Sequence, residues 1–219
     1  MPVRKPSRTQ DRIVAAAVDL FYRHGYAATG MADVLKKAKA NSGSFYFFFQ
    51  SKHDLLLAVL EWYQRLLQPI LLDPVYARTK DPIKRVFALL ALYRSNILTT
   101  GFAFGCPIGR LALEVDPKDH RAHDGIARNF DAWISAVRAN LDAAGSRLPR
   151  RLNRRQLSRL VLSVMEGGVM QSRSQRSIAP FDDSVAQLRH YFRRLGTEAG
   201  AECKARKNRA RRSSRKEKP

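Results

Sequence analysis

Hydrophobic residues recur at the spacing of α-helices along most of the chain, whereas the alternating pattern of strands is almost missing. The first third contains one long run, two short runs close together and a second long run that extends to about residue 71. Small polar residues or glycine stand at the ends of these runs, where such residues cap or terminate helices. The expected caps and stops are Ser7, Gly25, Thr29, Asn41 and Ser51. The pattern therefore predicts four helices in this part of the chain.

The remaining two thirds continue the helical pattern, with short connections between runs. Asp81 and Pro82 suit the N-cap and first-turn positions of one helix, and Gly145 suits the end of another. The expected helices run from Asp81 to Gly101, over 107–115, from Asp119 to about Ala144, from Asn153 to Ser172, and from Asp182 or Asp183 to Leu195. The sequence thus predicts an all-α fold of about nine helices.

Composition narrows the class of protein. Hydrophobic residues make up 45% of the 219 residues, which is enough for a buried core. The longest uninterrupted apolar stretch, 86–93, is far shorter than the roughly 20 residues that cross a bilayer, and the N-terminus has no hydrophobic signal segment. The two cysteines, Cys106 and Cys203, provide neither a disulfide framework nor a zinc spacing. We expect a cytoplasmic protein with no metal, no cofactor and no membrane partner.

Positive charge is the strongest compositional signal. Lysine and arginine number 40 against 19 acidic residues, a formal net charge of +21 that favours a polyanionic partner such as nucleic acid. Residues 201–219 alone carry nine basic and two acidic groups and no large apolar side chain. Such a segment cannot bury enough surface to fold, so we expect residues 199–219 to form a disordered basic tail that attracts phosphates. Solubility alone would also explain this tail.

Residues 31–50 contain the clearest candidate for a binding motif. Two short helices joined by about three residues match a helix-turn-helix, in which the second helix enters the major groove of DNA. That second helix begins with the small polar sequence 41–44, in which Gly43 allows close approach to the sugar-phosphate backbone. The flanking cations are Lys36, Lys37, Lys39 and Lys52. Lys52 also stands in a first helical turn, where free backbone N–H groups favour a phosphate.

Thirteen positions in this region agree in order and spacing with the signature of the tetracycline-repressor (TetR) family, which the chain resembles over some sixty residues. They are Phe21, Gly25, Tyr26, Thr29, Gly43, Ser44, Phe45, Tyr46, Phe49, Ser51, Lys52, Leu55 and Leu56. The resemblance implies a dimeric all-α transcriptional regulator whose C-terminal domain binds a small ligand. It further implies that the positions of Thr29, Tyr46 and Lys52 meet the DNA backbone, and those of Ser42, Ser44 and Phe47 lie against bases or backbone.

Two departures from the family pattern change the expected DNA contacts. The turn reads Ala38-Lys39-Ala40 where the family usually has Ala-Gly-Val, so Lys39 is expected to adopt a left-handed conformation at a cost of roughly 1 kcal/mol or more. Phe47 and Phe48 replace residues that are often histidine or tyrosine, which exchanges hydrogen bonds for apolar contact such as a thymine methyl group. The expected DNA contacts are Thr29, Lys39, Asn41, Ser42, Gly43, Ser44, Tyr46, Phe47 and Lys52.

The second domain resembles one branch of the family, with a Gly-Cys motif at 105–106 and a Met-Glu-Gly-Gly sequence at 165–168. We expect an aromatic and methionine-lined cavity, in which many of these side chains also serve simply as core. The candidate ligand contacts are Trp62, Phe102, Phe104, Cys106, Trp133, Met165, Glu166 and Met170, with Phe87 and Tyr93 also near the cavity. Cys106 precedes a helix N-terminus, where a thiolate that senses electrophiles is one hypothesis and a small buried residue is the other. For Glu166, pairing with another side chain such as Arg110 competes with ligand contact.

The last two helices are the expected dimer interface, in which they pair with their copies as a four-helix bundle. The expected interface residues are Leu157, Val161, Val164, Gly168, Leu188, Tyr191 and Phe192. A two-fold dimer would place two reading helices in successive major grooves about 34 Å apart on a palindromic operator. The expected domains are therefore a DNA-binding domain over 8–68, a ligand-binding and dimerisation domain over 69–198, and the tail.

Three functions remain open at this point. The favoured one is a regulator, by family default a repressor, that a small molecule or an electrophile releases from a palindromic operator in a bacterial nucleoid. The alternative is a basic DNA-coating protein with little sequence preference, which depends on the tail. An enzyme is least favoured, because no catalytic triad, phosphate loop or metal-ligand set is visible, and the histidine pair His120 and His123 suits a solvated helix start.

Overall fold

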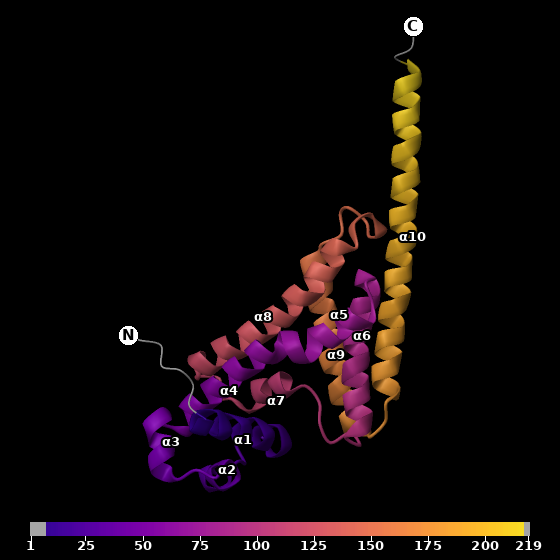
Figure 1. Cartoon of the computed structure of the whole chain (residues 1–219). Helices are drawn as coiled ribbons and strands as arrows, with labels where there is room; N and C mark the ends of the chain where they lie inside the picture. Colours follow the sequence, from indigo (N-terminus) through magenta and orange to yellow (C-terminus); the bar gives the residue numbers. More distant parts are fainter. Residues whose placement is uncertain (1–7, 217–219) are drawn as a thin grey trace, which may run out of the picture. The chain divides into compact units, whose positions relative to one another are not determined.

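The computed structural model describes residues 8–216, of which those after 206 are described by their backbone alone. Over these residues every regular element is a helix, which confirms the predicted all-α fold (Figure 1). The helices are α1 (Arg8–His24), α2 (Met31–Ala38), α3 (Ser42–Phe48), α4 (Lys52–Leu66), α5 (Asp73–Arg78), α6 (Pro82–Thr99), α7 (Pro107–Glu114), α8 (His120–Ala143), α9 (Arg154–Gln175) and α10 (Ala179–Lys216), with a π-helical segment at Leu67–Leu72 and a 3-10 turn at Gly145–Arg147. The expected cap at Ser7 lies outside the described residues.

Four of the predicted N-caps are present with their side-chain hydrogen bonds. Asn41 accepts from the backbone N–H of Ser44 at 2.8 Å, and Ser51 accepts from that of Asp54 at 3.1 Å. Asp81 caps α6 through the N–H groups of 83 and 84, and Asn153 caps α9 through that of 156. These bonds satisfy orphan donors of each first turn, which is why each helix begins where its sequence indicates.

Two predicted helix starts are wrong. Gly30, not Thr29, is the N-cap of α2, and it offers no side-chain bond. The last helix begins at Ala179 rather than after Asp182. The N–H of Ala179 donates to Ser177 Oγ at 3.3 Å, and the Asp182 carboxylate accepts from the guanidinium of Arg94 at 2.7 and 2.8 Å instead of capping the helix. Thr29 instead donates its hydroxyl back to the carbonyl of Gly25, four residues earlier, whereas Asp182 pairs with a residue 88 positions away.

The basic tail is helical in the structure, which corrects the prediction of a disordered arm. Helix α10 continues without a break from Ala179 to Lys216, the yellow end of the chain in Figure 1. Residues 201–216 consist mainly of alanine, lysine and arginine, which have high helix propensity, and no proline interrupts them. A helix that is already formed upstream adds such residues at little cost, since propagation is easier than nucleation.

The chain packs as two units, and the predicted domain borders do not follow them. Unit 1 comprises Met1–Leu71 and Ala103–Trp133, and unit 2 comprises Leu72–Phe102 and Ile134–Pro219. The prediction assigned 103–133 to the C-terminal domain, whereas α7 and the first half of α8 pack with the N-terminal helices. The core of unit 1 is apolar and fully buried at Ile13, Phe21, Val34, Phe45, Leu55, Leu56, Leu60 and Leu111.

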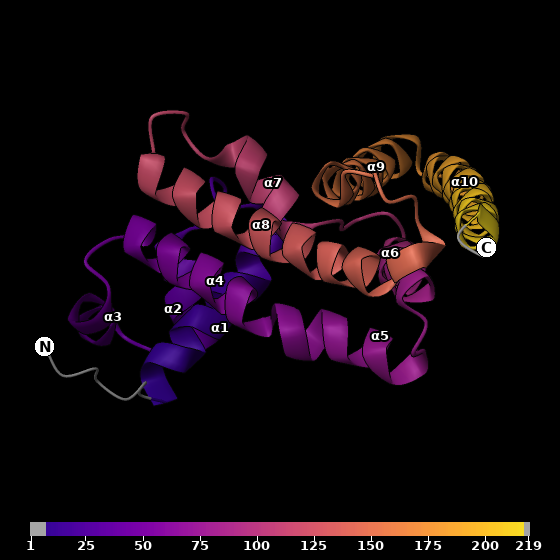
Figure 2. The same cartoon turned by 90° about the horizontal axis from the view of Figure 1, so that it is seen from above.

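Unit 2 is organised around the pair α9 and α10, which lie side by side in Figure 2. Gly168 on α9 permits this close approach, because a Cβ there would lie 2.9 Å from the Phe181 ring and 3.2 Å from its Cα. The Arg94 to Asp182 ion pair joins α6 to α10 in the same unit. Close packing at a glycine and a bidentate ion pair thus attach the first turns of α10 to α9 and α6.

One continuous helical stretch, Lys52–Arg78, is long and apolar enough to cross a membrane by length and composition alone. Its first half contributes Leu55, Leu56, Val59 and Leu60 to the buried core of unit 1. We assign the apolar character of that half to packing within the protein.

Candidate nucleic-acid interface

The turn between α2 and α3 has the geometry expected for a helix-turn-helix. Lys39 adopts φ 50° and ψ 49°, so the predicted left-handed conformation is confirmed. The N–H of Lys39 donates to the carbonyl of Lys36, and that of Ala40 donates to the carbonyl of Leu35 at 3.1 Å, a Schellman motif. This motif ends α2 after Ala38 and fixes the direction in which α3 departs.

Helix α3 divides its aromatic residues between core and solvent. Phe45 and Phe49 are buried in unit 1, whereas Tyr46 is 66% and Phe47 60% exposed. Large aromatic side chains at this exposure are unusual on a protein surface without a binding role. The helix therefore presents one face to the core and an aromatic face outward.

The first turn of α3 is small, polar and accessible. Asn41, Ser42 and Gly43 are exposed, and Ser44 is half-buried. A Cβ at Gly43 would meet only the Asn41 side chain, at 3.5 Å, so packing does not require glycine there. The absence of a side chain instead leaves room outside the helix, where the backbone of a nucleic acid approaches.

Lys52 stands in the first turn of α4, as predicted, and joins that helix to the loop before α2. Its Nζ donates to the carbonyl of Ala27 at 3.3 Å and lies 4.6 Å from the centre of the Tyr26 ring. Burial lowers the pKa of the Lys52 ammonium from its usual value, and the charge of Glu114 acts in the opposite direction. The ammonium is thereby held at a helix N-terminus, where cation and backbone N–H groups both favour a phosphate oxygen.

Thr29 does not have the exposed hydroxyl that the prediction requires. The residue is 4% exposed, and its Oγ1 donates to the carbonyl of Gly25 at 2.6 Å and lies 3.3 Å from that of Leu20. The hydroxyl therefore closes the end of α1. In this structure the threonine side chain is not available to a phosphate, and its role is to shape the loop that precedes α2.

A second set of contacts attaches α7 to that same loop. The Arg110 Nε donates to Glu114 at 2.7 Å, while its Nη1 donates to the carbonyls of Tyr22 and Arg23 at 3.1 and 3.3 Å. Glu114 in turn accepts from the N–H of Ala27 at 3.2 Å. We call these contacts the α7 clasp: Arg110 and Glu114 on α7 with the backbone of 22, 23 and 27. The clasp satisfies orphan carbonyls at the end of α1 and one donor of the loop.

Gly25 is required by the clasp. It has φ 92°, and a Cβ built on it would lie 2.5 Å from Glu114 Oε1 and 2.8 Å from Arg110 Nη2. Sequence reasoning identified Gly25 as a helix stop and as one position of the family signature. Its second role, room for the α7 side chains, depends on a contact between segments 85 residues apart, which no local pattern records.

The predicted ligand contacts are divided between the units. Trp62, Phe104, Cys106 and Trp133 belong to unit 1, and Phe102, Met165, Glu166 and Met170 belong to unit 2. Met165 is fully buried, but Met170 is 61% exposed, so its assignment to an enclosed cavity in one protomer is wrong. Met170 lies on the side of α9 opposite Met165, so its side chain points toward solvent.

Cys106 is half-buried and is the N-cap of α7. Near it, Tyr22 donates its hydroxyl to the carbonyl of Gly105 at 3.3 Å, and its ring lies 4.8 Å from that of Phe104. Burial raises the pKa of Tyr63, and the neighbouring Tyr22 and Cys106 raise it further. The Gly-Cys motif is thus tied to α1 and stands among phenol groups of unit 1.

Most of the predicted dimer contacts pack inside the protomer. Leu157, Val161, Gly168, Leu188 and Phe192 are buried within unit 2, which corrects their assignment to the partner surface. Helix α9 is apolar on two faces, and periodicity does not say which of them faces the partner. The large hydrophobic side chains left exposed on α9 and α10 are Leu160, Met170 and Tyr191, with Val164 half-buried beside them.

No metal site emerges from the predicted histidine pair. His123 Nε2 lies 3.2 Å from the carbonyl of Asp116, and the residues described include no group of three or more metal-ligating side chains. His53 pairs instead with Asp119 at 2.8 Å. The ion pair between His53 and Asp119 thus joins α4 to the residue that precedes α8.

Comparison with known proteins bears on both parts of the chain. A family model described as "Bacterial regulatory proteins, tetR family" matches residues 13–59, and one described as "Transcriptional regulator LmrA/YxaF-like, C-terminal domain" matches residues 82–187. The transcriptional regulator LmrA of Bacillus subtilis (strain 168) is 25% identical over 78% of this chain and 90% of its own length. The transcriptional repressor NemR of Escherichia coli (strain K12) is 26% identical over 83% of this chain and 92% of its own length.

A solved structure supports the same fold. It holds a cysteine-substituted form of the TetR family regulator CifR with 26-bp double-strand operator DNA, and it superposes with a TM-score of 0.67 at 19% identity over 84% of this chain and 98% of CifR. The first family match contains the helix-turn-helix described above, and the second spans α6 to the first turns of α10. The chain therefore belongs to the TetR family of bacterial DNA-binding transcriptional regulators.

Proposed function

We propose that this protein binds a palindromic operator as a homodimer and represses transcription until a small molecule releases it. The observation that carries the proposal is helix α3, whose exposed face combines a small polar first turn with Tyr46 and Phe47 at 66% and 60% exposure. Lys36, Lys37, Lys39 and Lys52 flank this helix in the sequence. Lys37 already pairs with Asp19 at 2.8 Å, so we assign the phosphate attraction mainly to the other three lysines.

The DNA contacts proposed for each protomer are the predicted set without the Thr29 hydroxyl. Lys39 and Lys52 bind phosphates, and Tyr46 contacts the backbone. Ser42, Gly43 and Ser44 lie against the groove with Asn41 at the helix start, and Phe47 makes apolar contact with a base. Serine and phenylalanine discriminate bases less strongly than a bidentate arginine, so sequence preference also depends on DNA shape.

Dimerisation uses the exposed side of α9 with Tyr191 of α10. Leu160, Val164 and Met170 follow one another at intervals of four and six residues on that side, and Gly167 between them has nothing within 4 Å of a built Cβ. A flat apolar stripe with a glycine at its centre favours close helix pairing with a second copy. Two-fold pairing then sets the spacing of the two α3 helices to one turn of DNA, about 34 Å.

The response to inducer passes through the α7 clasp. The Gly-Cys motif opens α7, and Arg110 and Glu114 on that helix hold the loop that leads into α2. An inducer that favours another position of α7 breaks these contacts. The equilibrium of the dimer then shifts toward conformations in which the two α3 helices are not spaced for the operator. Cys106 at the N-cap of α7 is the position where an electrophile would act, and Cys106→Ser is expected to abolish a response to electrophiles while leaving operator binding intact.

The test is selection of genomic fragments by the purified full-length protein at about 150 mM salt, where non-specific attraction is screened. An enriched palindrome supports the proposal. The matched control is Tyr46→Ala with Phe47→Ala, which is expected to lose the enrichment because both side chains are exposed and contribute little to the core. Recovery of DNA without sequence preference, lost on truncation after residue 200, would instead identify a DNA-coating protein.

We propose no catalytic activity for this chain, in keeping with a family of transcriptional regulators. Binding of DNA places the protein in the cytoplasm, at the nucleoid. The same purified protein, incubated with an excess of the inducer that releases it from the operator, is expected to show no turnover of that compound, so that at most one equivalent per protomer is consumed by addition to Cys106.

A further inference from the structure

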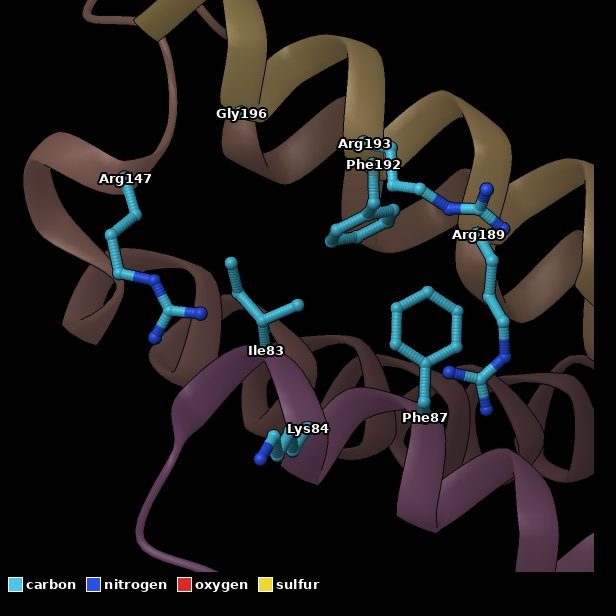
Figure 3. Close-up of a pocket in the computed structure, with 8 residues that line it drawn as sticks. All are labelled: Ile83, Lys84, Phe87, Arg147, Arg189, Phe192, Arg193 and Gly196. Carbon is cyan, nitrogen blue, oxygen red and sulfur yellow. The ribbon is translucent and has the colours of Figure 1, made fainter. Parts of the chain in front are cut away.

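Unit 2 contains a cleft of about 580 Å³ that the proposed function does not use. Its walls come from the start of α6, the turn at Gly145–Arg147 and the middle of α10. Figure 3 shows three apolar side chains, Ile83, Phe87 and Phe192, between Arg147 on one side and Arg189 on the other. A cleft of this volume is within the range of sites for small organic molecules.

The lining is strongly and unevenly charged. Its eight residues include Lys84, Arg147, Arg189 and Arg193 and no carboxylate. Asp81 pairs with Arg147 at 3.1 Å, but that carboxylate also caps α6. Within residues 8–206, no ion pair joins the other three cations to an acidic side chain. Like charges held together destabilise a fold, so an anion bound here would relieve repulsion that the protein itself leaves in place.

One of the cations, Arg189, packs on the apolar wall of the cleft. The Arg189 guanidinium lies 4.1 Å from the centre of the Phe87 ring, and the Phe87 and Phe192 rings meet edge to face with centres 5.2 Å apart. Burial lowers the pKa of Arg189, and the neighbouring charge of Arg193 lowers it further. Arg189 and Arg193 are both exposed on α10, and the Phe87 ring covers one face of the Arg189 guanidinium, so the N–H edge of that group can meet an anion.

We propose that this cleft binds a small organic anion, in which a carboxylate, phosphate or sulfonate meets Arg189 and Arg193 while a flat apolar body packs on Ile83, Phe87 and Phe192. A simple inorganic anion would fit this cleft less well than an organic one, because it would make no contact with the aromatic walls. A neutral aromatic molecule would also fit less well, because it would not pair with the positive charges of the arginines. This site goes beyond the proposed regulator function and does not depend on it, since binding is measured without DNA.

The experiment is calorimetric titration of the full-length protein with 2-naphthoate as the probe and 2-naphthamide as its neutral counterpart. We expect the acid to bind about tenfold or more tightly than the amide, as two charge-assisted hydrogen bonds imply. Arg189→Gln with Arg193→Gln is expected to weaken 2-naphthoate binding by about tenfold or more. The matched control, Arg121→Gln with Arg128→Gln, removes the same net charge from exposed positions of unit 1 and should change affinity less than about twofold.

Several results would overturn the proposal. Equal affinity for the acid and the amide would show that charge plays no part, and unchanged binding in the Arg189 and Arg193 double variant would place the probe elsewhere. Displacement of 2-naphthoate by a short non-operator DNA duplex would assign the cleft to a phosphate backbone instead. If the double variant does not fold, Lys84→Gln, an exposed position at the start of α6, provides the same comparison with a smaller expected loss.

Discussion

Replacing Lys39 by glycine is expected to stabilise the protein and weaken its binding to DNA. Lys39 ends α2 with φ 50° and ψ 49°, a conformation that costs a side-chain-bearing residue roughly 1–2 kcal/mol. Glycine removes that cost but adds backbone freedom to the unfolded chain, which offsets about 0.5–1 kcal/mol. Lys39→Gly should therefore raise the free energy of unfolding by roughly 0.5–1 kcal/mol per protomer, or about 1–4 °C in Tm for a chain of this size.

The loss of DNA affinity has a separate cause, and salt dependence isolates it. Each phosphate contact contributes a slope of about 0.9 to the fall of log affinity with log salt concentration. A dimer that loses the Lys39 ammonium from both protomers should therefore show a slope smaller by about 1.8. Fluorescence anisotropy on the selected operator at several salt concentrations measures this slope, and thermal unfolding at one fixed protein concentration measures stability.

Lys39→Ala is the control that separates the two effects. Alanine keeps the strained conformation and removes the charge, so it should match Lys39→Gly in DNA binding and the unaltered protein in stability. A Lys39→Gly protein no more stable than Lys39→Ala would refute the argument from backbone strain. Unchanged salt slopes in both variants would refute the phosphate contact while leaving the strain argument intact.

Three further outcomes follow from the packing. Phe47→Ala should weaken operator binding with less than about 0.5 kcal/mol change in stability, because the side chain is 60% exposed; equal losses in both would assign it to the core. Gly168→Ala should destabilise by about 1–3 kcal/mol through contact with Phe181, and a neutral thermal melt would contradict this. The Arg94 guanidinium lowers the pKa of Asp182, so the ion pair stabilises at neutral pH and is lost as pH falls through that lowered pKa, below about pH 4. Asp182→Asn should be less stable at pH 7 and lose less on acidification, whereas parallel pH curves would rule out this ion pair as the cause.

Local signals made several elements predictable from the sequence. Asn41, Ser51 and Asn153 cap helices through bonds that span three residues, so the residue types and their spacing contain the whole interaction. The strained turn at Lys39 was predictable for another reason, namely the resemblance to the family, in which this position of the turn is usually glycine. Thr29 is ambiguous at the same short range. Its hydroxyl can cap the helix that follows or bond back to the carbonyl of Gly25 four residues earlier, and the structure has the second bond.

The dimer surface shows a different reason for error. Helix α9 has apolar residues on two faces, Leu157 and Val161 inward and Leu160 and Val164 toward the surface. Helical periodicity shows that both faces of α9 are apolar. Which face packs in the core of the protomer and which is left for a partner depends on where α10 packs. The contact of Gly168 with Phe181 decides that choice, and it is visible only in three dimensions.

The strength of the α7 clasp suits a contact that an inducer has to release. Arg110 and Glu114 hold three backbone groups of the α1–α2 region through bonds of 3.1–3.3 Å. Partly exposed hydrogen bonds of this kind each contribute about 0.5–1.5 kcal/mol net, because water replaces them when they open. Their sum lies close to the 1–3 kcal/mol typical of the coupling between an effector and a distant site. A deeply buried ion pair at this position would resist release by any ordinary ligand, and a single solvent-exposed bond would transmit too little. The clasp therefore has a strength that is compatible with the proposed release by an inducer.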